Sequence, residues 1–82
     1  MISVIIVNWN AGQQLAACVW SVVNSSKGVV QKIVVVDNGS TDDSLAGIGQ
    51  IDNVEIIKAE ENLGFGRACN LGALRCSSVY IL

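Results

Sequence analysis

The sequence predicts an α/β domain built on a doubly wound, three-layer parallel sheet. Short runs of β-branched apolar residues alternate along its 82 residues with segments in which apolar residues recur at helical spacing. The resulting order is β-α-β-α-β-α-β, and the first three apolar runs end in residues that favour turns. Because strands separated by helices must run parallel and cross over in the right-handed sense, we expect helices on both faces of one sheet.

The first half of the chain contains two strands and one regular helix. Residues 3–7 form a β-branched run that predicts a buried strand, and turn-forming residues follow it at 8–12. Residues 32–36 predict a second buried strand. Between them, residues 13–26 carry one apolar helical face, made of Leu15, Val19, Val22 and Val23.

The second half predicts a short helix, a longer helix and two strands. Ser40, with Asp43 three residues later, has the form of a capping box and is expected to open the short helix. Residues 54–58 and 79–82 are the third and fourth apolar strands. The longer helix is expected from Phe65 to about residue 76, with these apolar side chains facing inward: Ala68, Leu71 and Leu74.

The composition describes one small domain with 51% hydrophobic and only 15% charged residues. That is apolar for a free domain of this size, which exposes much of its surface to water. Two interpretations stay open: the strands are buried on both faces, as in parallel sheets, or part of a larger protein is missing. The apolar strand at the end of the chain favours the second, so we expect residues 1–82 to be a single partial domain.

Charge and hydropathy exclude several classes of protein. The formal net charge is −2 and the five basic residues are scattered, so no nucleic acid partner is expected. The longest strongly apolar runs, 2–7 and 33–36, are far shorter than the roughly 20 residues of a membrane span. The first run also lacks the flanks of a signal peptide. We therefore expect a cytoplasmic protein with no transmembrane segment.

The cysteines do not predict a metal site. Cys18, Cys69 and Cys76 lack C-x-x-C spacing, and the chain has no histidine to complete a ligand set. We expect these cysteines to be small, buried apolar residues of the helices.

Three polar clusters follow the first three predicted strands, at residues 8–10, 37–42 and 62–67. Ligands of open α/β sheets bind at the carboxyl ends of the strands, near the point where the strand order reverses. Three loops that converge on one edge of the sheet therefore predict a binding site there.

The first two clusters offer an acid and an aromatic side chain. Asp37 either accepts a hydrogen bond from a ligand or caps the turn at 38–39 through its own side chain. Asp42 and Asp43 are better explained as acids that cap the following helix. Trp9 is a candidate platform for stacking on a base.

The third cluster offers accessible backbone N–H groups and the positive charge of Arg67. The glycines that follow Asn62, at Gly64 and Gly66, let the backbone approach a ligand at a helix N-terminus, which suits anions. Arg67 either meets a phosphate or is a solvated surface arginine. Asn70 binds either a neighbouring loop or the ligand. The segment is not a dinucleotide fingerprint, because it follows the third strand rather than the first.

Three blocks of sequence resemble the motifs of family 2 glycosyltransferases and occur in the same order. They are VIIVNWN at 4–10, VVVDNGSTD at 34–42 and NLGFGRACNLG at 62–72. Together they are highly specific and span nearly the whole chain, and they especially resemble the rhamnosyltransferase-like branch. The resemblance implies a GT-A fold with strand order 3-2-1-4, of which this chain is the N-terminal half of the nucleotide-binding domain.

The resemblance also implies an activity and a set of binding residues. Such enzymes transfer a sugar from a nucleoside diphosphate donor, usually UDP- or dTDP-linked, to an acceptor hydroxyl. Asp37 would hydrogen-bond the pyrimidine imide, and Arg67 is included because Cys69 stands where many relatives carry arginine. The residues expected to bind the nucleotide sugar are Val7, Asn8, Trp9, Asn10, Asp37, Asn62, Gly64, Arg67 and Asn70.

No catalytic or metal-binding residue is assigned to this sequence. In the family, the Asp-x-Asp motif that holds Mn²⁺ or Mg²⁺ and the catalytic base come after the fourth strand, so we expect the chain alone to be inactive. The implied strand order leaves 79–82 as an apolar edge, through which we expect self-association.

Two other classes of protein compete with a glycosyltransferase as interpretations of this sequence. A stand-alone, non-catalytic nucleotide-binding or interaction module stays open, because every visible feature concerns binding. A receiver-like signalling domain is disfavoured, because it needs acidic residues after the first strand and a phosphoacceptor aspartate after the third. This chain has Asn8 at the first position and Glu60 and Glu61 at the second.

Overall fold

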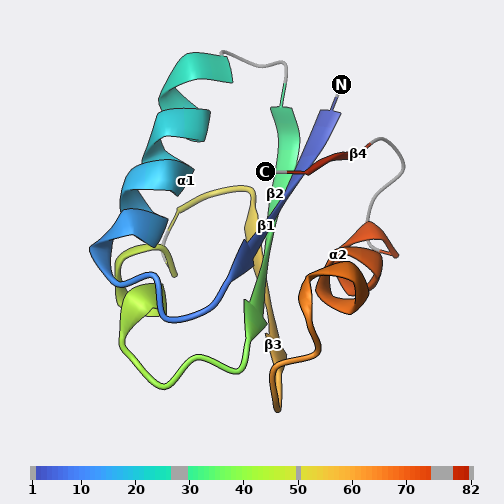
Figure 1. The fold of residues 1–82 in the computed structure, drawn as a ribbon. Coiled ribbons are helices and arrows are strands. Elements are labelled where there is room, and N and C mark those ends of the chain that lie inside the picture. The colour runs from blue at the N-terminus through green and yellow to red at the C-terminus, as the bar shows by residue number, and fades with distance from the viewer. Residues whose placement is uncertain (1, 27–29, 50, 75–78, 82) are drawn as a thin grey trace.

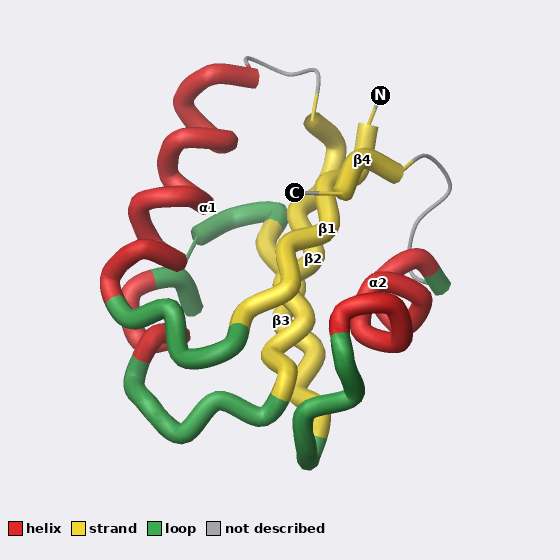
Figure 2. The backbone as a smooth tube through the Cα atoms, viewed as in Figure 1, coloured by secondary structure: helices red, strands yellow, loops and turns green. Residues whose placement is uncertain are grey.

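The computed structural model describes residues 2–26, 30–49, 51–74 and 79–81, which form one four-stranded parallel sheet with helices around it (Figures 1 and 2). The strand order is β3-β2-β1-β4. The elements are β1 (Ile2–Asn8), α1 (Gln13–Ser26), β2 (Val30–Asn38), the 3₁₀ helix η1 (Ser44–Gly47), β3 (Val54–Ala59), α2 (Phe65–Ala73) and β4 (Val79–Ile81). The predicted α/β class is confirmed, and the strand order is the one that the resemblance implies.

Helices cover both faces of the sheet, which gives three layers (Figure 1). α1 and η1 lie on one face, and α2 lies on the other. Successive residues of a strand point to opposite faces, so Val4 and Ile6 of β1 pack under α1 while Ile5 packs under α2. Because both faces are covered, the strands are continuous apolar runs rather than alternating ones.

Two hydrophobic cores hold the layers together. The core under α1 and η1 contains the buried residues Val4, Ile6, Leu15, Val19, Ile33, Val35 and Ile48. The core under α2 contains Ile5, Val34, Val36 and Ala68. Burial of one aliphatic side chain stabilises a fold by about 1.5–3 kcal/mol, so these two cores hold both helix layers on the sheet.

α1 begins and ends where the periodicity predicts. Leu15 and Val19 are buried, and Val22 and Val23 are half-buried against the same core. The predicted apolar face of this helix is therefore confirmed. None of the helices in the described ranges is both long enough and apolar enough to cross a membrane.

α2 lies close to the sheet because Gly72 has no side chain. A Cβ atom at this position would lie 2.8 Å from Cγ2 of Ile5 and 3.1 Å from Cγ2 of Val36. Ala68 and Cys69 are buried on this helix as well. Small residues on the inner side of α2 thus set its distance from the sheet.

The end of α2 differs from the prediction. The helix ends at Ala73, whereas the expected end near Cys76 lies outside the described residues. Leu74 is 82% exposed, so the prediction that it faces inward is wrong. Two residues are about 200° around a helix, which turns Leu74 away from the side that buries Gly72. Cys18 is half-buried, close to the burial expected of it.

The segment after β2 also differs from the prediction. η1 has four residues, and its N-cap residue Asp43 makes no side-chain cap hydrogen bond. The Oγ atom of Ser40 instead accepts the backbone N–H of Asn10, thirty residues earlier, at 2.9 Å. The predicted capping box is therefore wrong, because a distant loop engages the Ser40 hydroxyl. Asp42 takes the capping role, since its Oδ1 accepts the N–H of Ser44 at 3.1 Å.

Candidate functional site

The carboxyl ends of β1, β2 and β3 lie side by side at one edge of the sheet, the lower edge in Figure 1. In the register of the sheet, Asn8 pairs with Asp37, and Asp37 pairs with Lys58. The three loops that follow these strands therefore meet at this edge. Open parallel sheets bind their ligands here.

A group of hydrogen-bonded side chains lies on the α1 side of this edge. We call it the Asn8 cluster, and it consists of Asn8, Asn10, Asp37, Ser40, Asp42 and Ser44. The Nδ2 atom of Asn8 donates to Oδ1 of Asp37 at 2.9 Å. It also donates to the hydroxyl oxygens of Ser44, at 2.8 Å, and Ser40, at 3.1 Å. Asn8 is only 1% exposed and Asp37 only 5% exposed, so the centre of the cluster is shielded from water.

The cluster also fastens the loop after β1 to the loop after β2. Asn10 donates its N–H to Ser40, and its Oδ1 accepts the N–H groups of Thr41, at 2.8 Å, and Asp42, at 3.3 Å. The N–H of Gly12 donates to Oδ2 of Asp42 at 3.0 Å. Asn10 has φ of 50°, a conformation that asparagine adopts more readily than most residues. The two loops therefore form one unit.

Asp42 is the ionic anchor of this unit. Its Oδ1 accepts the hydroxyl of Ser44 at 2.6 Å. This hydrogen bond is the main reason that the pKa of Asp42 lies below its ordinary value of 3.8. Desolvation opposes the shift, while the N–H groups of Ser44 and Gly12 add to it. Asp42 is accordingly ionised at neutral pH, and it accepts hydrogen bonds from Gly12 after β1 and from Ser44 after β2.

A second group lies at the same edge, on the α2 side. We call it the Asn38 cluster, and it consists of Asn38, Asn62, Leu63 and Gly64. The Nδ2 atom of Asn38 donates to Oδ1 of Asn62 at 3.1 Å, and its Oδ1 accepts the N–H of Leu63 at 2.7 Å. Oδ1 of Asn62 also accepts the N–H of Gly64 at 2.8 Å. These contacts shape the loop that leads into α2.

The two clusters lie on opposite faces because neighbouring strand residues do. Val35 belongs to the core under α1 and Val36 to the core under α2. Continuing this alternation, Asp37 faces the α1 side and Asn38 faces the α2 side. The structure thus brings Asn8, Asn10 and Asp37 together, as the converging loops predict.

The predicted residues of the third loop form a separate group. Asn62 and Gly64 belong to the Asn38 cluster rather than to the group around Asp37. Sequence reasoning missed Asn38 as their partner. The available signal was its place one residue after Asp37, which puts an amide on the other face of the same strand end.

The remaining predicted residues lie outside both clusters. Val7 is half-buried and packs against the core under α2, and Trp9 is 58% exposed. Arg67 and Asn70 are exposed on α2, and neither side chain has a hydrogen bond or an ion pair within the described ranges. The alternative in which Asn70 binds a neighbouring loop is therefore not found there.

A hollow of about 390 Å³ opens beside Asp37. Its volume falls within the range of small-molecule sites. The side chains on its lining that can bind polar groups include Asp37, Ser40, Asp42, Lys58 and Glu60. Sequence reasoning missed Lys58, because only the register between β2 and β3 shows that it shares a face with Asp37. The signal that was available in the sequence was the position of Lys58, a charged residue at the carboxyl end of the predicted strand 54–58.

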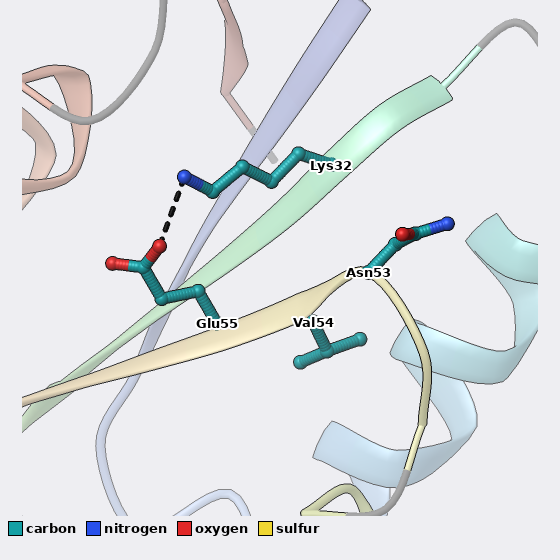
Figure 3. A pocket seen from close by; sticks show the side chains of 4 residues that line it. All are labelled: Lys32, Asn53, Val54 and Glu55. Carbon is teal, nitrogen blue, oxygen red and sulfur yellow. Dashed lines mark ion pairs between the residues drawn. The ribbon is translucent and has the colours of Figure 1, made fainter.

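A second hollow, of about 470 Å³, lies at the opposite edge of the sheet (Figure 3). Its lining is Lys32, Asn53, Val54 and Glu55, near the start of β3. Nζ of Lys32 and Oε1 of Glu55 form an ion pair at 2.9 Å, and about a third of each side chain is exposed. This is a surface pair at the amino ends of the strands, where parallel sheets do not usually bind ligands.

Metal ligands are not gathered in the described part of the chain. No three carboxylate, thiol or imidazole side chains among those residues come close enough to hold one ion. The residues of the Asn8 cluster therefore do not fit the divalent ion that the resemblance implies for a longer enzyme. Any such ion would take its ligands from elsewhere.

The sequence profile described as Glycosyl transferase family 2 matches residues 3–82. The chain belongs to glycosyl transferase family 2. A protein of Haemophilus influenzae named as an uncharacterized glycosyltransferase is 33% identical over an aligned length of 82, and the alignment covers 95% of this chain and 25% of that protein. The family 2 chain thus spans about a quarter of the length of this relative.

Except for Ser44, the residues of both clusters lie in the three blocks that carry the resemblance. The first block ends with Asn8 and Asn10, and the second supplies Asp37, Asn38 and Ser40. The third block begins with Asn62–Gly64, which completes the Asn38 cluster. The residues that mark the family in the sequence are therefore the ones that assemble the carboxyl edge of the sheet.

Proposed function

We propose that this family 2 chain is the donor-binding part of a glycosyltransferase. The donor is a UDP- or dTDP-linked sugar, and in the longer enzyme the sugar passes to an acceptor hydroxyl. The observation that carries the proposal is the carboxylate of Asp37, which is 5% exposed, held by Asn8 and placed beside an open hollow. A fixed carboxylate of this kind suits a ligand with a matching N–H donor.

The base of the donor is recognised by Asp37. Its Oδ1 takes the hydrogen bond from Asn8, which leaves further acceptor positions on the carboxylate. Uracil and thymine carry an imide N–H that donates to such an oxygen, whereas cytosine has an acceptor at that ring position. Uridine and thymidine nucleotides are therefore expected to bind more tightly than cytidine nucleotides.

The rest of the donor extends from this point across the loops. The segment from Val7 to Asn10 lines the base and ribose, with the exposed indole of Trp9 available for stacking. Asn62, Gly64 and Asn70 line the wall near the diphosphate. Arg67 lies in the first turn of α2, where the backbone N–H groups favour anions.

Arg67 is preferred over position 69 as the cation that meets the diphosphate. Cys69 is a thiol that is only 7% exposed on α2, whereas Arg67 is exposed. Because the guanidinium of Arg67 is exposed to solvent, it can contact a phosphate without a rearrangement of the protein. We also propose that the chain belongs to the rhamnosyltransferase-like branch, which the three blocks resemble most, and that it shares the donor type of that branch.

The chemical step belongs to a longer enzyme. This chain spans a quarter of the length of its Haemophilus influenzae relative. A Mn²⁺ or Mg²⁺ ion held by residues of that longer enzyme would neutralise the leaving diphosphate. The chain alone is therefore expected to bind donor without transferring sugar, and transfer by the purified chain would contradict this part of the proposal. The alternative, a non-catalytic binding module, would bind the donor equally well but would not be part of a longer enzyme that transfers sugar.

The binding proposal is tested by calorimetric titration with UDP, dTDP and CDP. Wild type is expected to prefer UDP and dTDP over CDP. Asp37→Ala is expected to weaken UDP binding at least about tenfold and CDP binding less, since it removes the acceptor for the imide N–H. Asp52→Ala, at an exposed turn, is the matched control and should bind like wild type. Equal binding of UDP and CDP by wild type would overturn the assignment of Asp37.

A further inference from the structure

Asn8 is satisfied at one end of its amide and unsatisfied at the other. Its Nδ2 lies within hydrogen-bond distance of three acceptors, on Asp37, Ser40 and Ser44. Its Oδ1 is buried and has no hydrogen-bond partner among the residues that the structure describes. Asn8 also continues a row in which Val4 and Ile6 face the core under α1. An apolar residue would extend that row without an unpaired acceptor, but it would leave the buried carboxylate of Asp37 without this donor. The asparagine is therefore explained by its contact with Asp37 rather than by packing in the core.

The orientation of this amide is fixed by its neighbours. The carboxylate of Asp37 needs a donor, so Nδ2 rather than Oδ1 must face it. The hydroxyl hydrogen of Ser44 points to Oδ1 of Asp42, at 2.6 Å, so Ser44 also offers Asn8 only an acceptor. Turning the amide over would place an oxygen against both partners. The unpaired Oδ1 is therefore the consequence of directing both N–H bonds at the acceptors.

We infer that Asn8 is the positioning residue for Asp37: it occupies one carboxylate oxygen and thereby presents the other to the base of the nucleotide. The inference rests on the proposed function. A continuous chain of hydrogen bonds supports the position of Asn8. It runs from the N–H of Gly12 through Asp42 and Ser44 to Asn8 and then to Asp37.

The charged groups at this series of hydrogen bonds come from two segments of the protein. Asp42 is itself a member of it, from the loop before η1. Lys58 and Glu60 line the hollow from β3 and from the loop after β3. β1 and η1 carry no titratable side chain, and the one titratable group of α1 is the thiol of Cys18. A second carboxyl group placed at residue 8 would therefore interact most strongly with Asp37, its nearest acid.

The test uses Asn8→Asp, which keeps the shape of the side chain and makes its donor depend on pH. When protonated, the introduced carboxyl group donates to Asp37 as the amide did. When ionised, it lies about 2.9 Å from Oδ1 of Asp37 and repels it. The UDP affinity of this variant is expected to be within about threefold of wild type at pH 5 and at least about tenfold weaker at pH 8.5. Dividing by the wild-type affinity at each pH removes the titration of the diphosphate.

Two controls separate positioning from a structural role. Asn24→Asp makes the same change on the exposed side of α1, and its affinity relative to wild type should not vary with pH. Ser44→Ala leaves Asn8 and Asp37 in place but removes one support of the amide. It is expected to reduce the preference for UDP over CDP about threefold, with circular dichroism showing a folded chain. This second variant decides the question if Asn8→Asp does not fold at high pH.

The outcomes distinguish this inference from the proposed function. If wild type binds neither UDP nor dTDP, the proposed function fails and the inference fails with it. If wild type binds UDP but Asn8→Asp follows it at every pH, only the inference is overturned. The same holds if Ser44→Ala weakens UDP and CDP equally, because a purely structural role lowers both affinities together.

Discussion

The two sides of the carboxyl edge are built differently, although both are made of short polar side chains. In the Asn8 cluster, three side chains are almost fully buried: Asn8, Asp37 and Ser44. The amide of Asn8 donates to both of the other side chains. In the Asn38 cluster only Asn38 is buried, and its partners are an exposed amide and backbone N–H groups. The first arrangement fixes an acceptor in a protected place, whereas the second fixes the path of a loop.

Under the proposed function, this difference predicts a different contribution of each cluster to binding. A buried carboxylate with prearranged partners can discriminate between bases, because a mismatched base leaves it unpaired. A loop held through its backbone sets where the N-terminus of α2 lies, which affects any anion there regardless of the base. Variants that break one cluster, the other or both therefore have different expected effects on stability and on the UDP-to-CDP preference.

Gly39→Ala is expected to have the largest effect, because it disturbs both clusters. Gly39 has φ of +82°, and a Cβ atom there would lie 2.9 Å from the backbone N of Asn62. The conformation alone costs about 1–2 kcal/mol for an alanine, and the contact with backbone adds to it. We expect a loss of about 2–4 kcal/mol in the free energy of unfolding, measured with urea. Gly49→Ala is the matched control, since nothing lies within 4 Å of that position. Equal stability of the two variants would show that the loops are not in close contact.

Asn38→Ala is expected to break the second cluster alone. It leaves the N–H of Leu63 without its acceptor and removes the contact with Asn62. The free energy of unfolding should fall by about 1–3 kcal/mol. Titration should show that the preference for UDP over CDP is unchanged, even if both affinities fall. A selective loss of UDP binding would mean that the two clusters are not independent.

Asp42→Asn is expected to alter the acid stability of the first cluster. The pKa of Asp42 is lowered in the folded state, so its ionised form stabilises the fold at pH values above its ordinary value of 3.8. That contribution is lost as the pH falls below 3.8 and through the lower folded-state pKa. Wild type should therefore be more stable than Asp42→Asn at pH 7, and the difference should shrink toward pH 3. Urea unfolding at both pH values measures it, with Asp52→Asn as the exposed control; a difference that stays constant with pH would refute this origin.

The smallest effect is expected at β4, the edge strand that pairs with Ser3–Ile5 of β1 rather than with the strand end at Asn8. β3 is one edge strand and carries Glu55 and Lys58, which discourage pairing with another chain. β4 is the other edge and has the sequence VYI, without charge. We propose weak self-association through β4, seen as a molecular mass that rises with concentration in analytical ultracentrifugation. A monomer mass at all concentrations would exclude it.

The fold could be predicted because its signals are local. Both faces of the central strands are covered, so β1 and β2 appear as apolar runs, and α1 shows its inner face through the spacing of Leu15 and Val19. The position of Leu74 was not predicted, because it depends on how far around α2 the sheet reaches. The predicted capping box at Ser40 was wrong for a similar reason. The Ser40 hydroxyl oxygen accepts the N–H of Asn10 in the loop after β1, a contact between distant parts of the sequence.

The candidate site could be predicted only in outline. The convergence of Asn8 and Asp37 follows from parallel strands that end at one edge. Their separation from Asn62 does not, because it depends on which face each residue of β2 points to. Lys58 was missed because the register of β3 against β2 fixes its neighbour. Pairwise geometry between distant segments is the information that a linear pattern lacks.

The hydrogen bonds of Asn8 join residues 29 to 36 positions apart, and all of their partners precede residue 45. During synthesis of the chain from its N-terminus, all the residues that these bonds join are therefore present before Asn62 has been added. The loop that leads to α2 is added afterwards. A ribosome-bound chain that has emerged through η1 should thus acquire base recognition before it acquires the wall for the diphosphate.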